Sequence, residues 1–175
     1  MRTVSFRVAA LALLLLLALS AAISGRIMQR LPNSVIYFVV TDGEQMRLAR
    51  AFRRLPRRPL EDHLAARLDA LLAGPSERNL ADDMVSAIPA GTQVLELDVH
   101  NKVVYVNLSS AFRRSSSPQG DRARLYQLMY SLLAAEGASS VALAVEGHPV
   151  RYFGTQGLIV SHPWQPLEDP ETLRW

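Results

Sequence analysis

Arginine is concentrated in one short stretch of this 175-residue chain. Half of the residues from 47 to 58 are arginines, namely Arg47, Arg50, Arg53, Arg54, Arg57 and Arg58. A guanidinium group binds carboxylates and phosphates through paired hydrogen bonds. The cluster is therefore suited to contact with an anionic polymer, lipid headgroups or an acidic protein surface. The same residues also suit a simpler role, in which solvated charge protects the edge of a sheet.

Two acidic residues, Glu96 and Asp98, lie two positions apart in an apolar stretch and share one face of a predicted strand. Paired carboxylates can serve general acid–base catalysis, as in a hydrolase. The same pattern is also typical of the solvated face of an amphipathic strand. A Ser-His-Asp triad stays open as well, because its members can lie far apart in the sequence.

Other chemical signals are missing from the sequence. There are no cysteines, which excludes a cysteine nucleophile and a Cys-based metal site. No two of the four histidines have the spacing of metal ligands: His63, His100, His148 and His162. The chain has no G-x-S-x-G elbow, no phosphate loop and no H-E-x-x-H helix. We therefore predict no catalytic residues, no metal site and no cofactor.

The N-terminus is hydrophobic and predicts export. Arg2 and Arg7 precede an uninterrupted apolar run, Val8–Ile23. As a helix this run spans roughly 24 Å, whereas a bilayer core is about 30 Å thick. Residues 1–26 are therefore predicted to be a signal anchor that tethers the protein to the membrane, with a cleaved signal peptide and secretion as the alternative. In both cases the rest of the chain leaves the cytoplasm, and nucleic acid is not an expected partner. Without cysteine, a lipid-modified cysteine cannot provide the anchor.

Apolar periodicity predicts the elements of the exported part. The continuous run at 35–40 indicates a buried strand, and the leucine stripe at 60–72 indicates a helix that ends at Gly74. Residues 92–108 alternate as two strands around a turn at His100-Asn101. A second leucine stripe predicts another helix, which ends near Gly137, and a strand follows at 140–147. The periodicity of 47–55 fits a helix and a strand equally well.

This order of elements predicts an α+β fold. A single mixed or antiparallel β-sheet should carry two α-helices on one face, preceded by the N-terminal hydrophobic helix. We expect a linker at residues 27–34, the folded domain at 35–166 and a C-terminal tail at 167–175.

Three motifs resemble those of the GerMN domain, the GerM-type domain of spore germination and sporulation proteins. A helix ends in L-L-A-G-P (Leu71–Pro75), a loop reads S-A-I-P-A-G-T (Ser86–Thr92), and a strand reads V-Y-V-N-L-S (Val104–Ser109), followed by Phe112. The second helix and the strand V-A-L-A-V-E-G after it also resemble the family, and the likeness extends over about residues 35–166.

The resemblance implies a non-catalytic, extracytoplasmic interaction module of the bacterial cell envelope. Such a module would self-associate or bind envelope proteins or peptidoglycan, with the membrane engaged through the N-terminal helix. An exported hydrolase acting on cell-wall polymer is the alternative function. The resemblance also favours a strand for 47–55.

The resemblance further implies that the motif residues serve the architecture. Gly74 would end a helix, while Pro89 and Gly91 would shape the approach to a strand. Leu108 and Phe112 would pack beneath the next helix.

Overall fold

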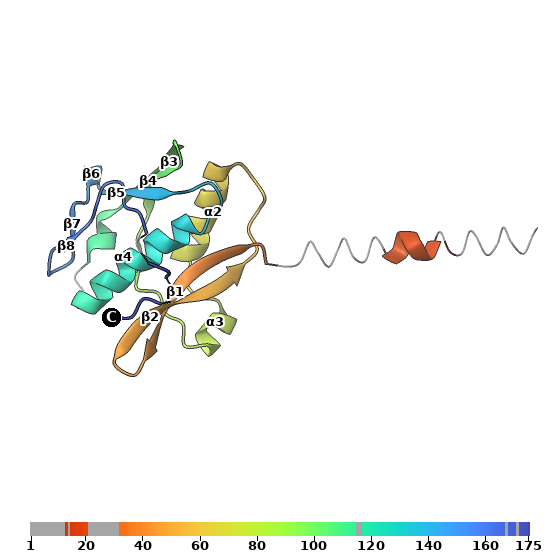
Figure 1. Ribbon diagram of the computed structural model, residues 1–175, viewed down its shortest axis with the longest axis horizontal. Helices are drawn as coiled ribbons and strands as arrows, with labels where there is room; N and C mark the ends of the chain where they lie inside the picture. The colour runs from red at the N-terminus through yellow and green to blue at the C-terminus, as the bar shows by residue number, and fades with distance from the viewer. Residues whose placement is uncertain (1–12, 14, 21–31, 115–116, 167, 171) are drawn as a thin grey trace, which may run out of the picture. The chain divides into compact units, whose positions relative to one another are not determined.

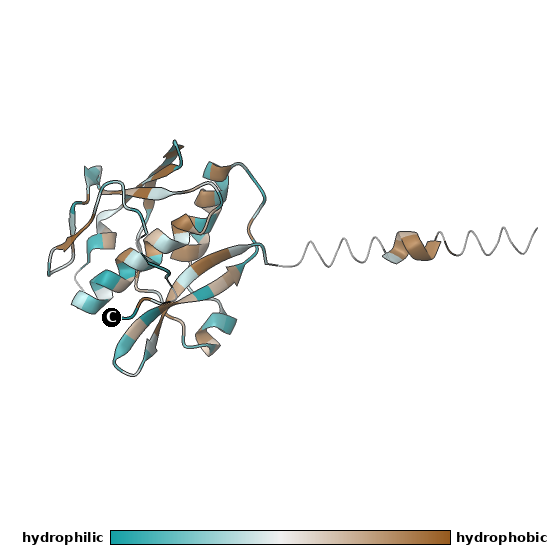
Figure 2. Ribbon diagram, viewed as in Figure 1, coloured by the Kyte–Doolittle hydropathy of each residue, from teal (hydrophilic) through white to brown (hydrophobic). Residues whose placement is uncertain are grey.

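The computed structural model describes residues 13, 15–20, 32–114, 117–166, 168–170 and 172–175 (Figure 1). The chain divides into two units, residues 1–32 and 33–175. In the first unit, Leu13 and residues 15–20 are helical and apolar apart from Ser20 (Figure 2). The rest of the predicted anchor and most of the predicted linker lie outside the described residues. No helix in the described part of the chain is long and apolar enough to cross a membrane.

The second unit begins with a β-hairpin. Strands β1 (Ser34–Asp42) and β2 (Gln45–Arg53) pair antiparallel, and Gly43 allows the tight turn with a φ of +61°. Most of β1 is buried on both faces, as its continuous apolar run predicts. The arginine-rich segment is a strand up to its residue 53, which confirms the interpretation taken from the family resemblance.

Helix α2 (Leu60–Leu72) follows and buries one stripe of side chains. Pro59 is its N-cap, and Gly74, with a φ of +83°, follows its C-cap Ala73. The predicted helix and its end are therefore confirmed. A short helix, α3 (Glu77–Ala81), occupies part of the loop that follows.

Strands β3 (Val94–His100) and β4 (Val103–Leu108) form a second hairpin. Its two turn residues are Asn101 and Lys102, both with positive φ, whereas the sequence predicted His100-Asn101. The turn lies one residue later because His100 still pairs with Val103. A bulge between Val94 and Glu96 leaves Leu95 unpaired and exposed, although alternation had placed it on the apolar face.

The main sheet is completed by a crossover through helix α4. This helix (Pro118–Leu133) starts at Ser117, whose hydroxyl accepts a hydrogen bond from the Gly120 amide at 3.1 Å. Strand β5 (Ser140–Val145) then pairs parallel to β4, and β6 (His148–Pro149) pairs antiparallel to β5. The resulting strand order is β3-β4-β5-β6.

The predicted α+β class, with a mixed sheet and two main helices, is confirmed. One detail differs: β1 and β2 form a two-stranded sheet of their own. On the side of β1 away from β2, Val39 exchanges backbone hydrogen bonds with Val85 in an isolated bridge. Helix α4 contacts both β1–β2 and β5, and Figure 1 shows it between them.

Hydrophobic burial holds these layers together. Apolar residues (brown) and polar residues (teal) both occur along α2 and α4, as expected for helices with one buried face (Figure 2). The fully buried side chains on these helices include Leu64, Leu68, Leu128 and Leu132. The described part of residues 33–175 thus has a hydrophobic core of its own, so this unit should fold independently of residues 1–32.

The C-terminal segment packs along the same unit. A small hairpin, β7 (Tyr152–Phe153) with β8 (Leu158–Ile159), comes first. Further on, Trp164 exchanges backbone hydrogen bonds with Val141 of β5, and Trp175 does so with Met46 of β2. Both tryptophan rings contact Tyr126 of α4. The C-terminal segment, whose residues 167–175 were predicted to be a tail, therefore bridges both sheets across α4.

Candidate binding surfaces

The arginines of the 47–58 segment fall on different parts of the structure. Arg47, Arg50 and Arg53 belong to β2, where alternate residues point to opposite faces. Arg47 and Arg53 are half-buried on one face, and Arg50 is exposed on the other. The segment between β2 and α2 holds three exposed arginines: Arg54, Arg57 and Arg58. The predicted binding surface is therefore not one continuous face, and its binding role stays a prediction.

Arg53 contributes to the packing of the hairpin. Its guanidinium carbon lies 5.6 Å from the centroid of the Phe38 ring, and its Nη1 donates a hydrogen bond to the Phe52 carbonyl at 3.2 Å. Its Nη2 is buried and has no hydrogen-bond partner among the described residues. Burial lowers the pKa of Arg53 from its ordinary value. This side chain is thus poorly placed to bind an external anion.

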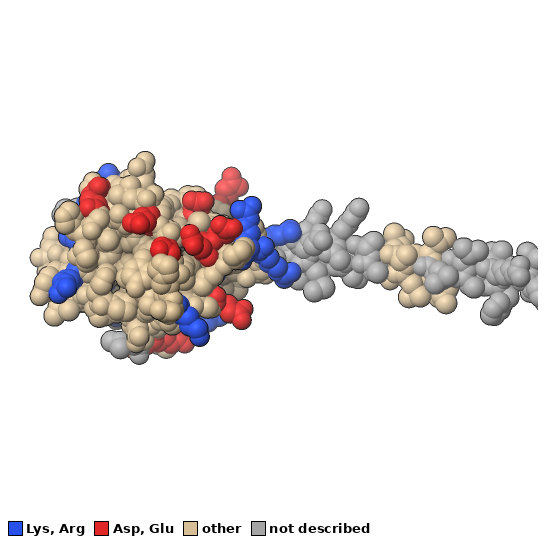
Figure 3. Space-filling model, turned by 90° about the horizontal axis from the view of Figure 1, so that it is seen from above, with Lys and Arg blue, Asp and Glu red and all other residues tan. Residues whose placement is uncertain are grey.

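Arg57 and Arg58 line a hollow of about 800 Å³ beside the start of α2. We call it the arginine hollow. Its wall also includes His63 and Arg67 of α2, and Glu136 is the one acidic residue among the described residues that line it. Figure 3 shows several basic side chains (blue) close together at one edge of the 33–175 unit, with acidic ones (red) nearby.

Arg67 lines the inner wall of this hollow, and only 2% of its surface is exposed. Its Nη1 donates to the carbonyl oxygens of Val35 and of Ser131, the latter at 3.1 Å. Its Nη2 lies 3.5 Å from the Ala134 carbonyl oxygen and 3.3 Å from His63 Nε2. Arg67 therefore joins α2 to β1 and α4. Burial lowers its pKa to about 10.

His63 supports Arg67 as a neutral side chain. Its Nδ1 lies 3.1 Å from the Pro56 carbonyl oxygen, which can only accept a hydrogen bond, so Nδ1 carries the proton. Its Nε2 then accepts from Arg67, and the Ser34 hydroxyl, which donates to Asn33 Oδ1, lies 3.4 Å from the same nitrogen. This histidine thus orients the guanidinium of Arg67.

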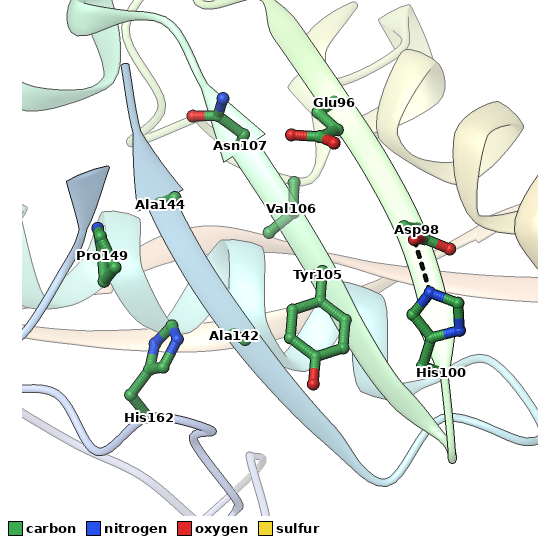
Figure 4. A pocket seen from close by; sticks show the side chains of 10 residues that line it. All are labelled: Glu96, Asp98, His100, Tyr105, Val106, Asn107, Ala142, Ala144, Pro149 and His162. Carbon is green, nitrogen blue, oxygen red and sulfur yellow. Dashed lines mark ion pairs between the residues drawn. The ribbon is translucent and has the colours of Figure 1, made fainter. Parts of the chain in front are cut away.

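A second hollow, of about 290 Å³, lies on the solvent-facing side of the main sheet, and we call it the sheet hollow (Figure 4). Its floor includes the small side chains of Ala142 and Ala144 on β5. Polar side chains surround them from β3, β4 and the C-terminal segment: Glu96, Asp98, His100, Tyr105, Asn107 and His162. The pairing of Glu96 with Asn107 and of Asp98 with Tyr105 brings these residues to one face.

The structure thus brings together carboxylate and histidine side chains of the kind that a hydrolase would use, but these side chains are accessible to solvent. Asp98 Oδ2 and His100 Nε2 are 2.8 Å apart, and these two side chains are 45% and 69% exposed (Figure 4). Asp98 Oδ1 accepts a hydrogen bond from the Val99 amide at 2.7 Å, so both carboxylate oxygens are occupied. Catalytic acids and bases are usually tuned by burial, which this hollow does not provide. Among the described residues, no group of three or more His, Asp or Glu side chains could hold a metal ion.

The order of elements and the motif loops can now be compared with known proteins. Residues 35–151 match the family model Germane, described as sporulation and spore germination. The chain belongs to the Germane family. The matched region covers more than half of the chain, from β1 to just beyond β6. No curated protein matches this chain significantly.

Solved structures share the Germane fold at low sequence identity. The tandem GerMN domains of the sporulation protein GerM from Bacillus subtilis match with a TM-score of 0.59 and 15% identity, covering 76% of this chain and 46% of that one. The first of those domains gives a TM-score of 0.60 and 15% identity, covering 78% and 100%. A candidate lipoprotein from Clostridium perfringens gives 0.55 and 20%, covering 75% and 85%. This chain thus spans about half the length of the tandem-domain chain.

The motif residues of this Germane domain serve its architecture, as predicted. Gly91 has a φ of +83°, and Thr92 donates two hydrogen bonds to the Pro89 carbonyl, from its amide at 3.2 Å and its hydroxyl at 2.7 Å. The side chains of Leu108 and Phe112 are fully buried in the core. The Germane motifs therefore shape loops and core of the domain.

Two buried polar residues of α4 hold these Germane loops, and the sequence analysis missed both. Arg124 Nη1 donates to the carbonyls of Phe112 at 2.8 Å and Arg114 at 2.7 Å, and its Nε donates to Ala87 at 3.1 Å. Gln127 Oε1 accepts from the Ala87 amide at 2.7 Å. Burial lowers the pKa of Arg124, and nearby Asp121 opposes that shift.

The sequence analysis also missed Arg67, although the sequence contained a signal for its burial. It lies three residues after Leu64 and four before Leu71, within the apolar stripe of α2. A charged residue at a stripe position points to a buried side chain with specific partners.

Proposed function

We propose that this Germane protein is a membrane-anchored, extracytoplasmic interaction module of the bacterial cell envelope, without catalytic activity. The apolar run Val8–Ile23 supports the anchor. Similar solved domains come from a sporulation protein and a candidate lipoprotein, which supports a place at the cell envelope.

The buried polar side chains give the main support for this proposal, because their hydrogen bonds stabilise the domain itself. Arg67, Arg124 and Gln127 are almost completely buried, and their hydrogen bonds connect loops and helices of the domain itself. The titratable side chains of the sheet hollow, by contrast, are exposed, apart from Asp98, which is half-exposed. The buried polar groups thus form hydrogen bonds within the domain, and the polar groups of the sheet hollow are in contact with solvent. This distribution suits a protein that binds partners through its surface.

The exposed arginines before α2 supply the contact surface in this proposal. Arg54, Arg57 and Arg58 project from the segment that joins the hairpin to α2, where a partner could reach them. Their expected partners are acidic surfaces of envelope proteins or anionic groups of the cell wall. The same arginines could also bind an acidic surface of a second copy of this chain, which would give self-association.

Capture of envelope material tests the proposal. Purified wall and membrane fractions would be incubated with the immobilised chain, and bound material would be measured at low and moderate salt. Replacing Arg54, Arg57 and Arg58 by Gln should reduce capture and its salt dependence. A matched control replaces three exposed arginines elsewhere: Arg78, Arg113 and Arg151. Equal capture by both triple variants and the wild type would refute a contact through these arginines, and no capture by the wild type would refute the module.

An exported hydrolase acting on wall polymer is the second candidate, favoured by the sheet hollow. Glu96, Asp98 and His100 lie together around it, as an acid–base mechanism would require. Release of soluble fragments from purified cell wall would test this function. A release that Asp98→Asn and Glu96→Gln abolish would establish the hydrolase, whereas equal release by the wild type and these variants would remove it.

A further inference from the structure

The arginine hollow carries an excess of positive charge. Arg57, Arg58 and Arg67 line it, and Glu136 is the one acidic residue among its described lining residues. His63 is neutral, because it donates to Pro56 and accepts from Arg67. The hollow therefore has the charge of a site for an anion.

Arg67 provides a second and independent observation. Only 2% of its surface is exposed, and its Nη atoms bond to carbonyl oxygens and to His63 rather than to a carboxylate. Its Nε is buried without a hydrogen-bond partner among the described residues. A buried cation is costly unless an opposite charge compensates it, and an anion in the hollow would provide that charge.

The start of α2 faces the same space. Its N-cap Pro59 and first residue Leu60 line the hollow, and no side chain caps this end of the helix. The free backbone amides of a 13-residue helix carry partial positive charge. Glu61 and Asp62 in the first turn offset part of it, but both side chains are exposed and neither lines the hollow.

We propose that the arginine hollow binds a phosphate-bearing anion. Arg57 and Arg58 are exposed and can fold over a bound group, while Arg67 supplies fixed charge from the wall. Guanidinium groups that approach from several directions suit a tetrahedral anion with three or four acceptor oxygens. A hollow of about 800 Å³ also has room for the molecule that carries the phosphate, such as a lipid headgroup. This inference rests on the proposed interaction module and names its ligand class.

Thermal unfolding of the full chain in neutral detergent micelles tests the proposal. Unfolding can be followed by the fluorescence of Trp164 and Trp175, which pack against Tyr126 of α4 in the fold. The probes are inorganic phosphate, pyrophosphate, and micelles doped with phosphatidylglycerol or with zwitterionic phosphatidylcholine. Potassium chloride at matched ionic strength controls for screening. At about ten times the Kd, a bound anion should raise the Tm by about 3–6 °C.

The decisive variant is Arg57→Gln with Arg58→Gln, which removes two charges from the hollow and leaves Arg67 in place. The control is Arg78→Gln with Arg151→Gln, which removes the same charge from exposed positions elsewhere. We expect the wild type and the control to show the full rise in Tm, and the hollow variant to lose most of it.

The pattern of responses separates the possible sources. A rise with phosphatidylglycerol alone identifies a membrane headgroup, and a rise with phosphate or pyrophosphate alone identifies a soluble ligand. No rise with any phosphate probe, or an equal rise in the hollow variant, would overturn the proposal. If the wild type responds to none of the phosphate probes but still captures envelope fractions, this site alone is refuted and the interaction module stands.

Discussion

The arginine hollow and the sheet hollow both contain charged side chains, but the surroundings of these side chains differ. Around the sheet hollow, Asp98 and His100 are paired with each other; Asp98 is half-exposed and His100 is largely exposed to water. Around the arginine hollow, Arg67 is almost fully buried, and its partners are backbone carbonyls and a neutral histidine. In the sheet hollow, the paired side chains are accessible to solvent. In the arginine hollow, a buried guanidinium bonds to carbonyl groups and a histidine and not to a carboxylate.

This difference indicates which charged residues the fold depends on. An exposed ion pair contributes little, because water screens it and two mobile side chains must be ordered. A buried guanidinium that satisfies several carbonyls cannot be removed without leaving those carbonyls unpaired. We therefore expect stability to depend on Arg67 of the arginine hollow and hardly at all on the Asp98–His100 pair of the sheet hollow.

Removal of the Arg67 side chain should have the largest effect. Arg67→Ala should lower the free energy of unfolding by about 3–5 kcal/mol, because carbonyls of β1 and α4 lose their donors and a cavity forms. Urea denaturation of residues 33–175 measures this loss. Arg67→Lys, which keeps the charge but not the forked donors, should recover only part of it. A cost below about 1 kcal/mol for Arg67→Ala would contradict a structural role.

Truncation of the leucines on the helices gives a scale for that effect. Leu68 of α2 and Leu132 of α4 are 1% and 0% exposed, as their apolar stripes predict. Leu68→Ala and Leu132→Ala should each cost about 2–5 kcal/mol through lost burial and a residual cavity. The same urea experiment applies, and exposed Ala65→Ser serves as a control. A cost under about 0.5 kcal/mol at both leucines would mean that these helix faces are not buried.

Breaking the ion pair of the sheet hollow should have a much smaller effect. Asp98→Asn and His100→Gln should each change the free energy of unfolding by less than about 1 kcal/mol, since the pair is exposed. The double variant should differ little from either single variant. A coupling free energy above about 2 kcal/mol in this double-mutant cycle would show that the two hollows are energetically alike.

The smallest effect on stability is expected at the exposed arginines. Arg57→Gln with Arg58→Gln should leave the free energy of unfolding within about 0.5 kcal/mol of the wild type, because both side chains are exposed. The same variant is expected to lose phosphate binding. Urea denaturation without phosphate separates the two properties. A large loss of stability would show that these arginines help to hold the fold, and their loss of binding would then need another explanation.

Local patterns in the sequence were sufficient for most helices and strands. The apolar run of β1 and the leucine stripes of α2 and α4 depend on neighbours within a few residues, so periodicity reveals them. The turn after β3 was misplaced by one residue, because His100 still pairs with Val103 of β4, and this pairing between strands is not visible in the local pattern. The segment 47–55 fitted a helix and a strand equally well, and only the family resemblance favoured the strand.

The candidate sites were less accessible to sequence reasoning. The cluster of six arginines was visible, but its division between β2 and the segment before α2 was not. Glu96 and Asp98 were correctly expected on one strand face, while His162 reaches the same hollow from the C-terminal segment. That segment lies there because Trp164 pairs with Val141, a contact between residues far apart in the chain.

The sequence by itself determined the hydrophobic N-terminus, the absence of cysteine, the α+β class and the motif loops of the Germane family. These features follow from composition and from short-range spacing. Only the tertiary structure decided that Arg67 and Arg124 are buried, while Arg57 and Arg58 stay in solvent. Burial depends on which distant elements pack over a residue: here β1 and α4 close over Arg67, whereas the short segment that carries Arg57 and Arg58 is left uncovered.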